Sequence, residues 1–361
     1  MRKKLCNYVI IPLFVFIVVV FSGGKNVDAA SNVRINSSNF PDVNFRKRIQ
    51  VYDKNHDGSL SKSEINKVKK LDLRNTKHKK NMKNITNYKG IEYFTNLRSF
   101  ICGDYDSDSR RPKGVLDLSR NKKLEYVSIG EQPFTSYIKE VKLTNCKKLK
   151  EVYISNGSTV EKLDLKGCTN LTKIFIMDDN RLKSLDVSSC RKLKELDICE
   201  ARKLTKVKLG EINKLEILDI AICPSLKNIN IKNQTNLKSL SLSKASIKNL
   251  DLKNKKQLTG LSLQETPITS LDLSNQEKLE SLRLFWMNIP QLDLSNQKNL
   301  RWIAIRKTKL NQLDLSQTLI TRAKVASDVD YYCYVYDKNV EIVFADGEKI
   351  MSPFDRDTSV K

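Results

Sequence analysis

The chain has 361 residues, of which 65 are Lys or Arg and 41 are Asp or Glu, so its formal net charge is +24 at pH 7. It has only two histidines and no G-x-S-x-G, P-loop, dinucleotide-binding or H-E-x-x-H motif, so we expect no enzyme. A hydrolase that pairs a cysteine with His78 is the remaining catalytic alternative. The positive charge favours anionic partners, but no recognition motif indicates specific nucleic-acid binding.

The first 30 residues have the pattern of a secretory signal peptide. Basic residues at positions 2–4 precede an apolar run at 8–21, and the small residues that follow permit cleavage after Ala29 or Ala30. A retained membrane anchor is the alternative. After cleavage the charge would be 61 − 40 = +21, because four basic residues and one Asp leave with the segment. We expect a secreted, extracellular or cell-surface associated protein that does not span a membrane.

Residues 53–64 match the twelve-residue calcium-binding loop of an EF-hand. Gly58 stands where such a loop bends sharply, and Leu60 stands where it is anchored to a core. Ser59 would contribute its main-chain carbonyl, and Ser61 would act through a water. The alternative is a surface turn that binds no metal, but we predict calcium because every ligand position is filled. The predicted ligands are Asp53, Asn55, Asp57, Ser59, Ser61 and Glu64.

The sequence on both sides of this loop predicts helices, because apolar residues share one helical face. These residues are Phe45, Ile49 and Tyr52 before the loop, and Ile65, Val68 and Leu71 after it. A single loop has no EF-hand partner, so we expect a modest calcium affinity, on the order of 10⁻⁴–10⁻³ M. The ion would be structural, because it would lock two helices into an N-terminal cap over residues 31–75.

A second acidic segment, residues 104–108, alternates carboxylates with other side chains in an early insertion. It has neither the Gly nor the terminal Glu of a calcium loop. We interpret this segment as a solvated loop.

From Leu237 to Leu315 a unit of about 21 residues recurs. A fixed period of this length indicates a solenoid, because one unit cannot bury its apolar face alone and must stack on its neighbours. Each unit holds two stretches that alternate with period two, which predicts two short parallel strands per turn. Traced towards the N-terminus, the first leucine of the unit predicts about ten turns, mostly of 21–22 residues and longer at the start. These leucines are Leu97, Leu124, Leu149, Leu171, Leu193, Leu215, Leu237, Leu258, Leu279 and Leu300.

The unit L-x-x-L-x-L, followed by I-x-x-L-D-L-S, resembles leucine-rich repeats, most closely the bacterial variants. With the calcium-type loop and residues 40–46 and 90–97, the chain resembles secreted, internalin-like proteins of Gram-positive bacteria over roughly residues 38–317. The resemblance implies an architecture but no particular ligand. Asn is missing from its usual slot after L-x-L, so we expect an irregular convex side. That slot holds Asp179, Ala201, Cys223, Ala245, Thr266, Met287 and Thr308.

Seven cysteines remain after the first 30 residues, and three of them recur every 22 residues at one corner of successive turns. These three are Cys146, Cys168 and Cys190, and later turns place Gln234, Gln276 and Gln297 in the same slot. We expect the three cysteines to point inwards as small fillers without bridges among them. A disulfide framework is the alternative for a secreted chain.

Residues that alternate with the inward leucines of the first strand should form an outward face. Aromatic side chains and Arg concentrate there, and exposed residues of these types mark interfaces. The alternative is that some of them pack against insertions or the C-terminal segment. The Asp of each L-D-L segment also faces outwards, and we interpret this series as solvated and turn-bonding. The predicted partner-binding residues are Tyr126, Tyr153, Phe175, Met177, Arg283, Phe285, Trp286, Trp302 and Arg306.

The period stops after Leu315. Residues 331–336 and 340–344 alternate like strands, which predicts a β-hairpin that pairs with the last turn and closes the open sheet edge. The predicted organisation is a signal peptide at 1–30, a helical cap at 31–75, the repeat solenoid at 76–317 and a C-terminal β cap at 318–361.

The sequence therefore predicts an α+β repeat solenoid of the leucine-rich repeat type with an EF-hand-like cap. We expect a monomeric, non-enzymatic binding protein that contacts a protein or glycan at a cell surface and carries structural calcium. The alternative is an envelope protein that binds polyanions, such as teichoic acid or anionic glycans.

Overall fold

The computed structural model describes residues 32–74, 85–103, 114–130, 138–155, 160–327 and 332–352. The predicted signal peptide, the acidic segment 104–108 and His78 lie outside the described residues. Within the described part of the chain, no helix is long and apolar enough to cross a membrane.

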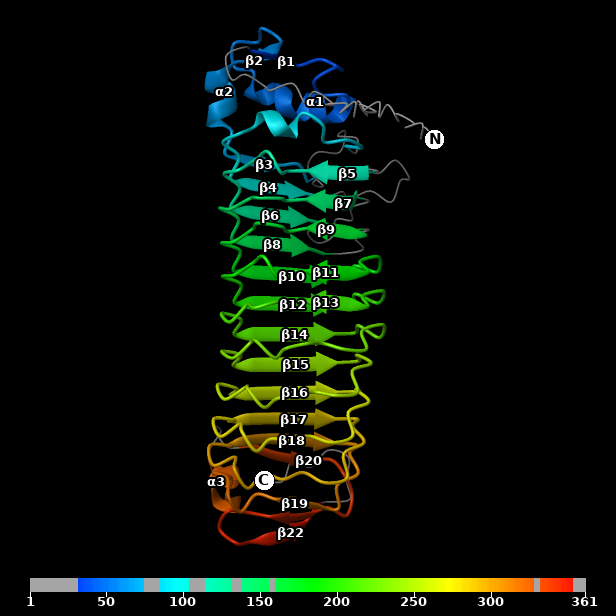
Figure 1. The fold of residues 1–361 in the computed structure, drawn as a ribbon, viewed down its shortest axis with the longest axis vertical. Coiled ribbons are helices and arrows are strands. Elements are labelled where there is room, and N and C mark those ends of the chain that lie inside the picture. Colours follow the sequence, from blue (N-terminus) through cyan, green and yellow to red (C-terminus); the bar gives the residue numbers. More distant parts are fainter. Residues whose placement is uncertain are drawn as a thin grey trace, which may run out of the picture.

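A twelve-stranded parallel sheet runs along the whole solenoid (Figure 1). Its spatial order follows the chain order throughout, and β20 lies directly beside β18. The prediction of stacked parallel strands is confirmed. The strands are β3 (Lys70–Asp72), β4 (Ser99–Cys102), β6 (Tyr126–Ile129), β8 (Glu151–Ile154), β10 (Lys173–Met177), β12 (Glu195–Cys199), β14 (Ile217–Ala221), β15 (Ser239–Ser243), β16 (Gly260–Gln264), β17 (Ser281–Phe285), β18 (Trp302–Arg306) and β20 (Tyr332–Val335).

The register of this sheet explains why the sequence repeats. Leu240, Leu261 and Leu282 are paired neighbours on β15, β16 and β17, and each is at most 2% exposed. Because side chains alternate across a strand, the residues between these leucines face the opposite side of the sheet. The inward side chains of all turns join into one continuous hydrophobic core.

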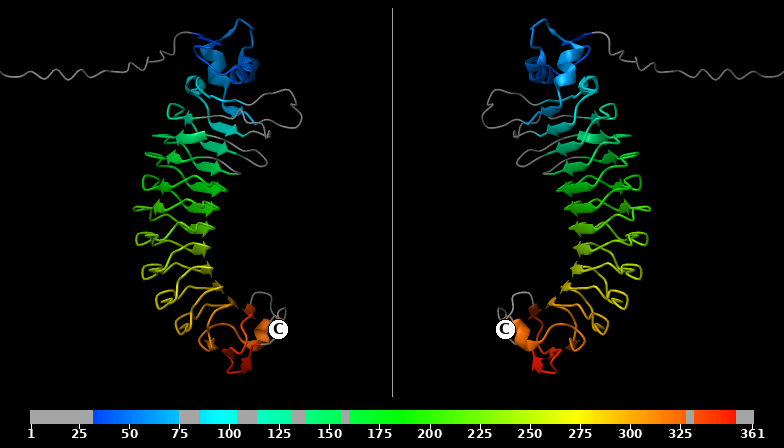
Figure 2. Two further views of the ribbon diagram at one scale, coloured as in Figure 1. Left: turned by 90° about the vertical axis from the view of Figure 1, so that its right-hand side faces the viewer. Right: turned by 90° about the vertical axis from the view of Figure 1, so that its left-hand side faces the viewer.

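The convex side forms strands in the early turns and again at the C-terminal end, where β19 (Gln312–Asp314) pairs with β21 (Glu341–Val343). Strands β5 (Gly114–Asp117), β7 (Ile138–Lys142) and β9 (Lys162–Asp164) form one parallel sheet, and β11 (Ser184–Asp186) pairs with β13 (Lys206–Lys208). The equivalent residues 249–251, 270–272 and 291–293 form no strand, so the prediction of two strands in every turn is wrong there. The solenoid curves (Figure 2), and its outer side is longer than its inner side. We attribute the loss of strands to outer turns spaced beyond the roughly 4.8 Å that a β-ladder requires.

The turn that leaves the concave sheet is closed by main chain rather than by Asn. In the concave sheet, the first residue after each strand from β10 to β17 has a positive φ, and its N–H donates to the last carbonyl of the next strand of that sheet. Bulky side chains rarely adopt this left-handed conformation, yet Ile222 and Trp286 do so with φ values of 53° and 52°. Asp179 occupies one of the missing Asn slots, and its carboxylate accepts the N–H groups of Arg181 and Leu182.

The corner slot of the cysteines supplies an inward donor in several turns. The thiols of Cys146 and Cys168 donate to the main-chain carbonyls of Leu118 and Leu143 at 3.5 and 3.1 Å. Gln276 and Gln297 donate in the same manner to the carbonyls of Leu252 and Leu273. All seven described cysteines are free thiols. Burial raises the pKa of Cys146 to about 11 and that of Cys168 to about 12, so these thiols are poor nucleophiles.

The N-terminal segment places two short helices above the first strand of the sheet. Helix α1 (Val43–Ile49) continues into η1 (Gln50–Tyr52), and α2 (Lys62–Lys67) follows the short strand β2 (Ser59–Leu60). The Asp42 carboxylate caps α1 by accepting two main-chain N–H groups. The predicted second helix is shorter than expected, because Leu71 lies in β3 and pairs there with Phe100. A cluster of buried rings, which includes Phe40 and Phe45, joins this segment to η2 (Ile91–Tyr93).

The C-terminal segment differs from the predicted hairpin. Strand β20 is parallel to β18 in the concave sheet, whereas β21 (Glu341–Val343) is parallel to β19 (Gln312–Asp314). The hairpin is instead formed by β21 and β22 (Lys349–Met351). Cys333 and Val335 take the inward slots of Ile303 and Ile305, so this segment makes one more coil of the solenoid. The sequence hides this coil because α3 (Arg322–Ser327) interrupts the period.

Candidate functional site

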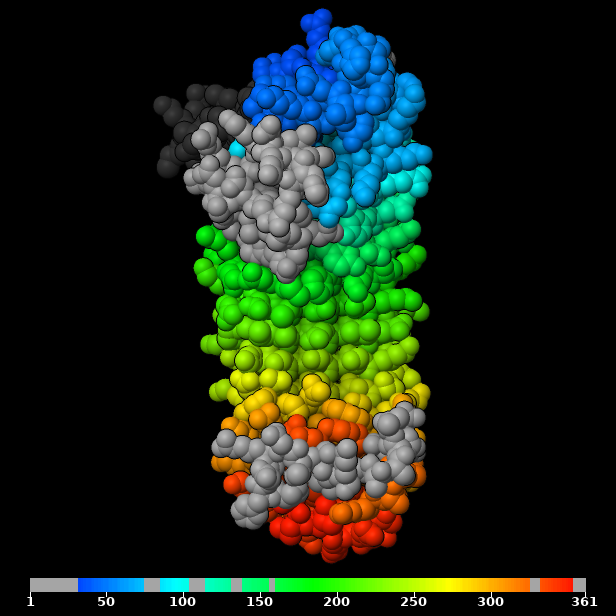
Figure 3. Space-filling model, turned by 180° about the vertical axis from the view of Figure 1, so that it is seen from behind, coloured from blue at the N-terminus to red at the C-terminus, as the bar shows by residue number. Residues whose placement is uncertain are grey.

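The predicted partner-binding residues lie along the concave side of the solenoid. Figure 3 views the molecule from this side, and Figure 2 shows the main sheet lining it. Each predicted side chain is exposed or partly exposed, as alternation along the strands requires. They fall into two groups at the two ends of the sheet, with β12, β14, β15 and β16 between them.

The first group, which we name the tyrosine patch, comprises Tyr126, Tyr153 and Phe175. These rings lie on the adjacent strands β6, β8 and β10, with centroids 5.5 and 5.9 Å apart. The Tyr153 hydroxyl donates to the Glu151 carboxylate at 3.2 Å. Burial, followed by the charge of Glu151, raises the pKa of Tyr153 to about 12. Met177 lies at the end of β10, two residues beyond Phe175.

The second group, the arginine–aromatic cluster, lies on β17, β18 and β20 and on the residues that follow β17 and β20. The guanidinium of Arg283 lies 5.1 Å from the ring centre of Phe285 and 5.5 Å from that of Trp302. Arg306 lies 4.9 Å from the ring centres of both Trp286 and Tyr336. Stacking on aromatic faces holds a guanidinium in place without using its N–H groups. The cluster comprises Arg283, Phe285, Trp286, Trp302, Arg306, Tyr332, Tyr334 and Tyr336.

The three tyrosines of this cluster are missing from the prediction. Trp302 stacks on Tyr332 with centroids 5.2 Å apart, and Tyr332 stacks on Tyr334 at 5.6 Å. The signal in the sequence is the alternation of tyrosines with Cys333 and Val335, which matches the outward and inward slots of a repeat strand. Because the extra coil is not evident from the sequence, these tyrosines are assigned there to a separate C-terminal cap.

The two arginines differ from the other cations near the concave sheet. Lys150, Lys238 and Arg301 each lie within about 3 Å of a Glu carboxylate on the preceding turn. In the part of the chain that the structure describes, neither Arg283 nor Arg306 has a carboxylate partner. Arg283 is exposed, so its five N–H donors face the open side of the sheet.

Between the two groups, the concave sheet carries acidic side chains on β12 and β14 and small side chains on β15 and β16. Asp197 and Asp219 lie opposite each other on β12 and β14. Burial, and then the charges of Asp219 and Glu195, raise the pKa of Asp197 to about 6. Burial also raises the pKa of Asp219. Beyond them, serines and a glycine on β15 to β17 leave a shallow hollow of about 450 Å³ that reaches Arg283 and Trp302.

The EF-hand-like loop is a second candidate site. The Asp53 carboxylate accepts the N–H groups of Asp57 and Gly58, and the Asp57 carboxylate accepts that of Ser59. The Asn55 side chain donates to Asp57 at 2.9 Å. These three side chains therefore converge on one short loop, in which Gly58 has a φ of 77°. All of the converging ligand atoms are hard oxygens, which suits calcium.

Two further features bear on calcium at this loop. Strand β2 pairs with β1 (Val33–Arg34), so an N-terminal strand stands where a second EF-hand loop would pair. Glu64 turns its carboxylate towards the N–H groups of Lys54 and Ser61, at 2.6 and 2.8 Å. These hydrogen bonds lower the pKa of Glu64 to about 2. Across the described residues no three His, Cys, Asp or Glu side chains are gathered as for a metal.

Comparison with known proteins identifies the fold. No family profile matches the sequence, and a search of curated proteins finds no match. Among solved structures, the functional domain of InlJ from Listeria monocytogenes, described as including a cysteine ladder, is 22% identical with a TM-score of 0.56, covering 87% of this chain and 72% of that one. An internalin, InlF, from Listeria monocytogenes str. 4b F2365 is 19% identical with a TM-score of 0.50, covering 86% of each chain. This chain has the internalin-type leucine-rich repeat fold.

In this internalin-type solenoid the repeated Asp of the L-D-L segments is a turn-forming residue. The carboxylate of each accepts the main-chain N–H two residues later, for example Asp186 from Ser188 and Asp293 from Ser295, both at 2.9 Å. Hydrogen bonds of this kind hold a turn. The series is Asp117, Asp164, Asp186, Asp251, Asp272, Asp293 and Asp314.

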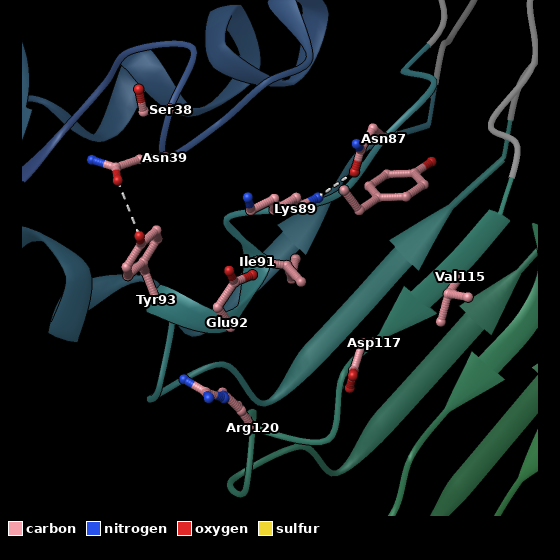
Figure 4. Close-up of a pocket in the computed structure, with 11 residues that line it drawn as sticks. Ser38, Asn39, Asn87, Lys89, Ile91, Glu92, Tyr93, Val115, Asp117 and Arg120 are labelled. Carbon is pink, nitrogen blue, oxygen red and sulfur yellow. Dashed lines mark hydrogen bonds between the residues drawn. The ribbon is translucent and has the colours of Figure 1, made fainter. Parts of the chain in front are cut away.

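A polar pocket of about 640 Å³ lies between the N-terminal segment and the first convex strand (Figure 4). Lys89, Glu92, Asp117 and Arg120 bring charges of both signs to its wall. The Tyr93 hydroxyl is within 3.1 Å of the Asn39 side-chain oxygen, and burial raises the pKa of Tyr93. None of the predicted partner-binding residues lines this pocket.

Proposed function

We propose that this chain is a secreted, non-enzymatic binding protein that attaches to a protein partner at a cell surface through its concave face. The observation that carries the proposal is the arginine–aromatic cluster. Arg and large aromatic residues dominate the energetics of protein interfaces. Here they lie on a rigid sheet, and the two arginines have no carboxylate partner among the described residues.

The alternative is an envelope protein that binds polyanions. The net charge of +24 supports it, because such an excess attracts anionic polymers over the whole surface. The concave face argues for a protein instead. A uniformly anionic polymer that followed the sheet from Arg283 towards β12 would meet Asp219, Asp197 and Glu195.

Cell binding measured by flow cytometry separates the two candidates. We expect the labelled mature chain to bind host cells at physiological salt, and mild protease treatment of those cells to abolish the signal. The double variant Arg283→Ala/Trp302→Ala should lose binding, whereas Lys227→Ala/Lys253→Ala, which removes two exposed charges outside the concave strands, should keep it. Binding that collapses as salt rises, survives protease and ignores the aromatic substitution would instead establish the polyanion function.

We also propose that calcium occupies the EF-hand-like loop as a structural ion. Asp53, Asn55 and Asp57 would hold it with side-chain oxygens, and the Ser59 carbonyl and Glu64 would complete the shell. Ser61, whose hydroxyl donates to Glu64 at 2.8 Å, would contribute through a water. The ion would rigidify the segment that covers the first turn, since solenoid ends require covering.

A further inference from the structure

One column of the concave sheet joins the acidic pair to the arginine–aromatic cluster. The paired residues in this column are Asp197, Asp219, Ser241, Ser262 and Arg283, one from each successive strand. Three strand spacings of roughly 4.8 Å separate Asp219 from Arg283, which is about 14 Å. Of the two serines between them, Ser262 borders the hollow of about 450 Å³. The column therefore has a negative end, a small polar floor and a positive end.

We propose that this column binds an extended segment of a protein partner with a basic and an acidic side chain four residues apart. The acidic side chain would lie against Arg283 and Arg306, and the basic one against Asp219 and Asp197. An extended chain rises roughly 3.3 Å per residue, so four residues span about 13 Å, and positions i and i+4 point to the same side. This inference rests on the proposed function and specifies the chemistry of its ligand.

The positive end is built to bind a carboxylate. Arg283 is held between Phe285 and Trp302, which fixes its plane and leaves its N–H donors for the ligand. A planar guanidinium suits a two-oxygen anion because it donates two parallel hydrogen bonds. By contrast, the neighbouring Arg301, which precedes Trp302, already donates to Glu280 at 2.9 Å.

The negative end is suited to a cation. One Asp219 carboxylate oxygen is buried without a hydrogen-bond partner in the described structure. An unpaired buried polar atom is costly, so a ligand ammonium or guanidinium that donated to it would relieve that cost. Lys173, whose charge acts on Asp197, is bound to Glu195 at 2.7 Å. On β15 and β16 the hollow is lined only by serines, a glycine and the inward leucines. The backbone of a bound peptide therefore fits over it.

Tryptophan fluorescence gives a direct test, because the chain has two tryptophans and both lie in the cluster. The probe is a tryptophan-free peptide, Ac-GKSGSEG-amide, titrated into the full mature chain at physiological salt. We expect its saturable response to weaken about 10- to 100-fold when Glu is replaced by Gln, the range for a charged hydrogen-bonded pair. Replacement of Lys by Gln should weaken it several-fold, and the uniformly acidic peptide Ac-GESGSEG-amide should bind less well than the probe.

Variants of the protein test which residue recognises each charged side chain of the peptide. Arg283→Gln should abolish the preference for Glu over Gln in the peptide, and Asp219→Asn should abolish the preference for Lys. The matched control Arg301→Gln removes the same charge one residue from Trp302 and should leave both preferences intact. Circular dichroism and the melting temperature verify that each variant is folded.

Three results would overturn the inference: no response up to several millimolar probe, equal responses to the acidic and the mixed peptide, or an unchanged preference in Arg283→Gln. A chain that binds cells through the cluster in the flow-cytometry experiment but ignores the peptide would refute this inference alone. Tighter binding of a heparin-derived hexasaccharide than of the peptide, undiminished by Arg283→Gln, would also overturn it.

Discussion

The two ends of the concave sheet occupy the same repeat slots but carry different chemistry. In the tyrosine patch the rings contact one another, and the Tyr153 hydroxyl is bound to Glu151, so the polar groups there already have partners. In the arginine–aromatic cluster the rings support guanidiniums whose donors are open. The comparison teaches that the repeat determines where a side chain points, whereas its neighbours on adjacent strands decide whether it is available to a ligand.

The first prediction tests whether the two ends are equally well supported by the core. Ile174 below the tyrosine patch and Ile303 below the cluster occupy equivalent inward slots, and both are fully buried. We expect Ile174→Ala and Ile303→Ala each to reduce the free energy of unfolding by about 2–5 kcal/mol, through lost burial and the cavity left behind. Urea denaturation measures both. A difference of more than about 2 kcal/mol would show that the ends differ in packing as well as in surface chemistry.

The second prediction tests whether the cluster, rather than the tyrosine patch, is the binding site. Arg283→Ala/Trp302→Ala should weaken cell binding about 100-fold, as expected when two central interface residues are removed. Tyr126→Ala/Tyr153→Ala, the matched double substitution in the tyrosine patch, should weaken it less than about threefold. Flow cytometry of concentration series gives both ratios. The reverse order would place the binding site at the N-terminal end.

The third prediction is that calcium affects the N-terminal end of the solenoid but not the cluster. At about 2 mM Ca²⁺ and a dissociation constant of ~10⁻⁴ M, binding would stabilise the native chain by about 2 kcal/mol. Chelation should therefore increase hydrogen exchange in residues 32–74, near the tyrosine patch, while tryptophan emission from the distant cluster stays constant. Hydrogen-exchange mass spectrometry with and without chelator checks this.

The control for the calcium prediction is Glu64→Gln, which keeps the size of the side chain but removes its charge. This variant should exchange as the chelated wild type does, with or without calcium. An equal response of Glu64→Gln and wild type to added calcium would exclude the loop as the site.

The fourth prediction concerns the acidic pair between the two ends. The pKa of Asp197 is raised to about 6, above its ordinary value of 3.8, so the ionised carboxylate is unfavourable in the folded state at neutral pH. Its destabilising contribution should therefore decrease as the pH falls through 6 towards 3.8, and be absent below that value. Asp197→Asn should raise the melting temperature by about 2 °C at pH 7.5 and have little effect at pH 4. Calorimetry at the two pH values checks this, and a stabilisation that is the same at both would refute it.

Much of the fold can be predicted from the sequence because the repeat is local and strict. The leucines identify the inward side of each strand, and strand alternation then places residues such as Phe175 and Trp302 on the opposite face. The convex strands and the C-terminal coil could not be predicted so well. Residues 270–272 and 184–186 have the same sequence, Ser-Leu-Asp, but only the latter form a strand, so the local sequence alone does not decide it.

The sequence by itself determined the solenoid, its inward leucines and the outward position of most candidate binding residues, because these follow from periodicity within single turns. Only the tertiary structure decided that β20 joins the concave sheet and brings three tyrosines to the cluster. It also decided that Arg283 and Arg306 rest on rings while neighbouring cations are paired with Glu. The physical reason is that these contacts join residues on different turns, and their partners depend on how the turns stack.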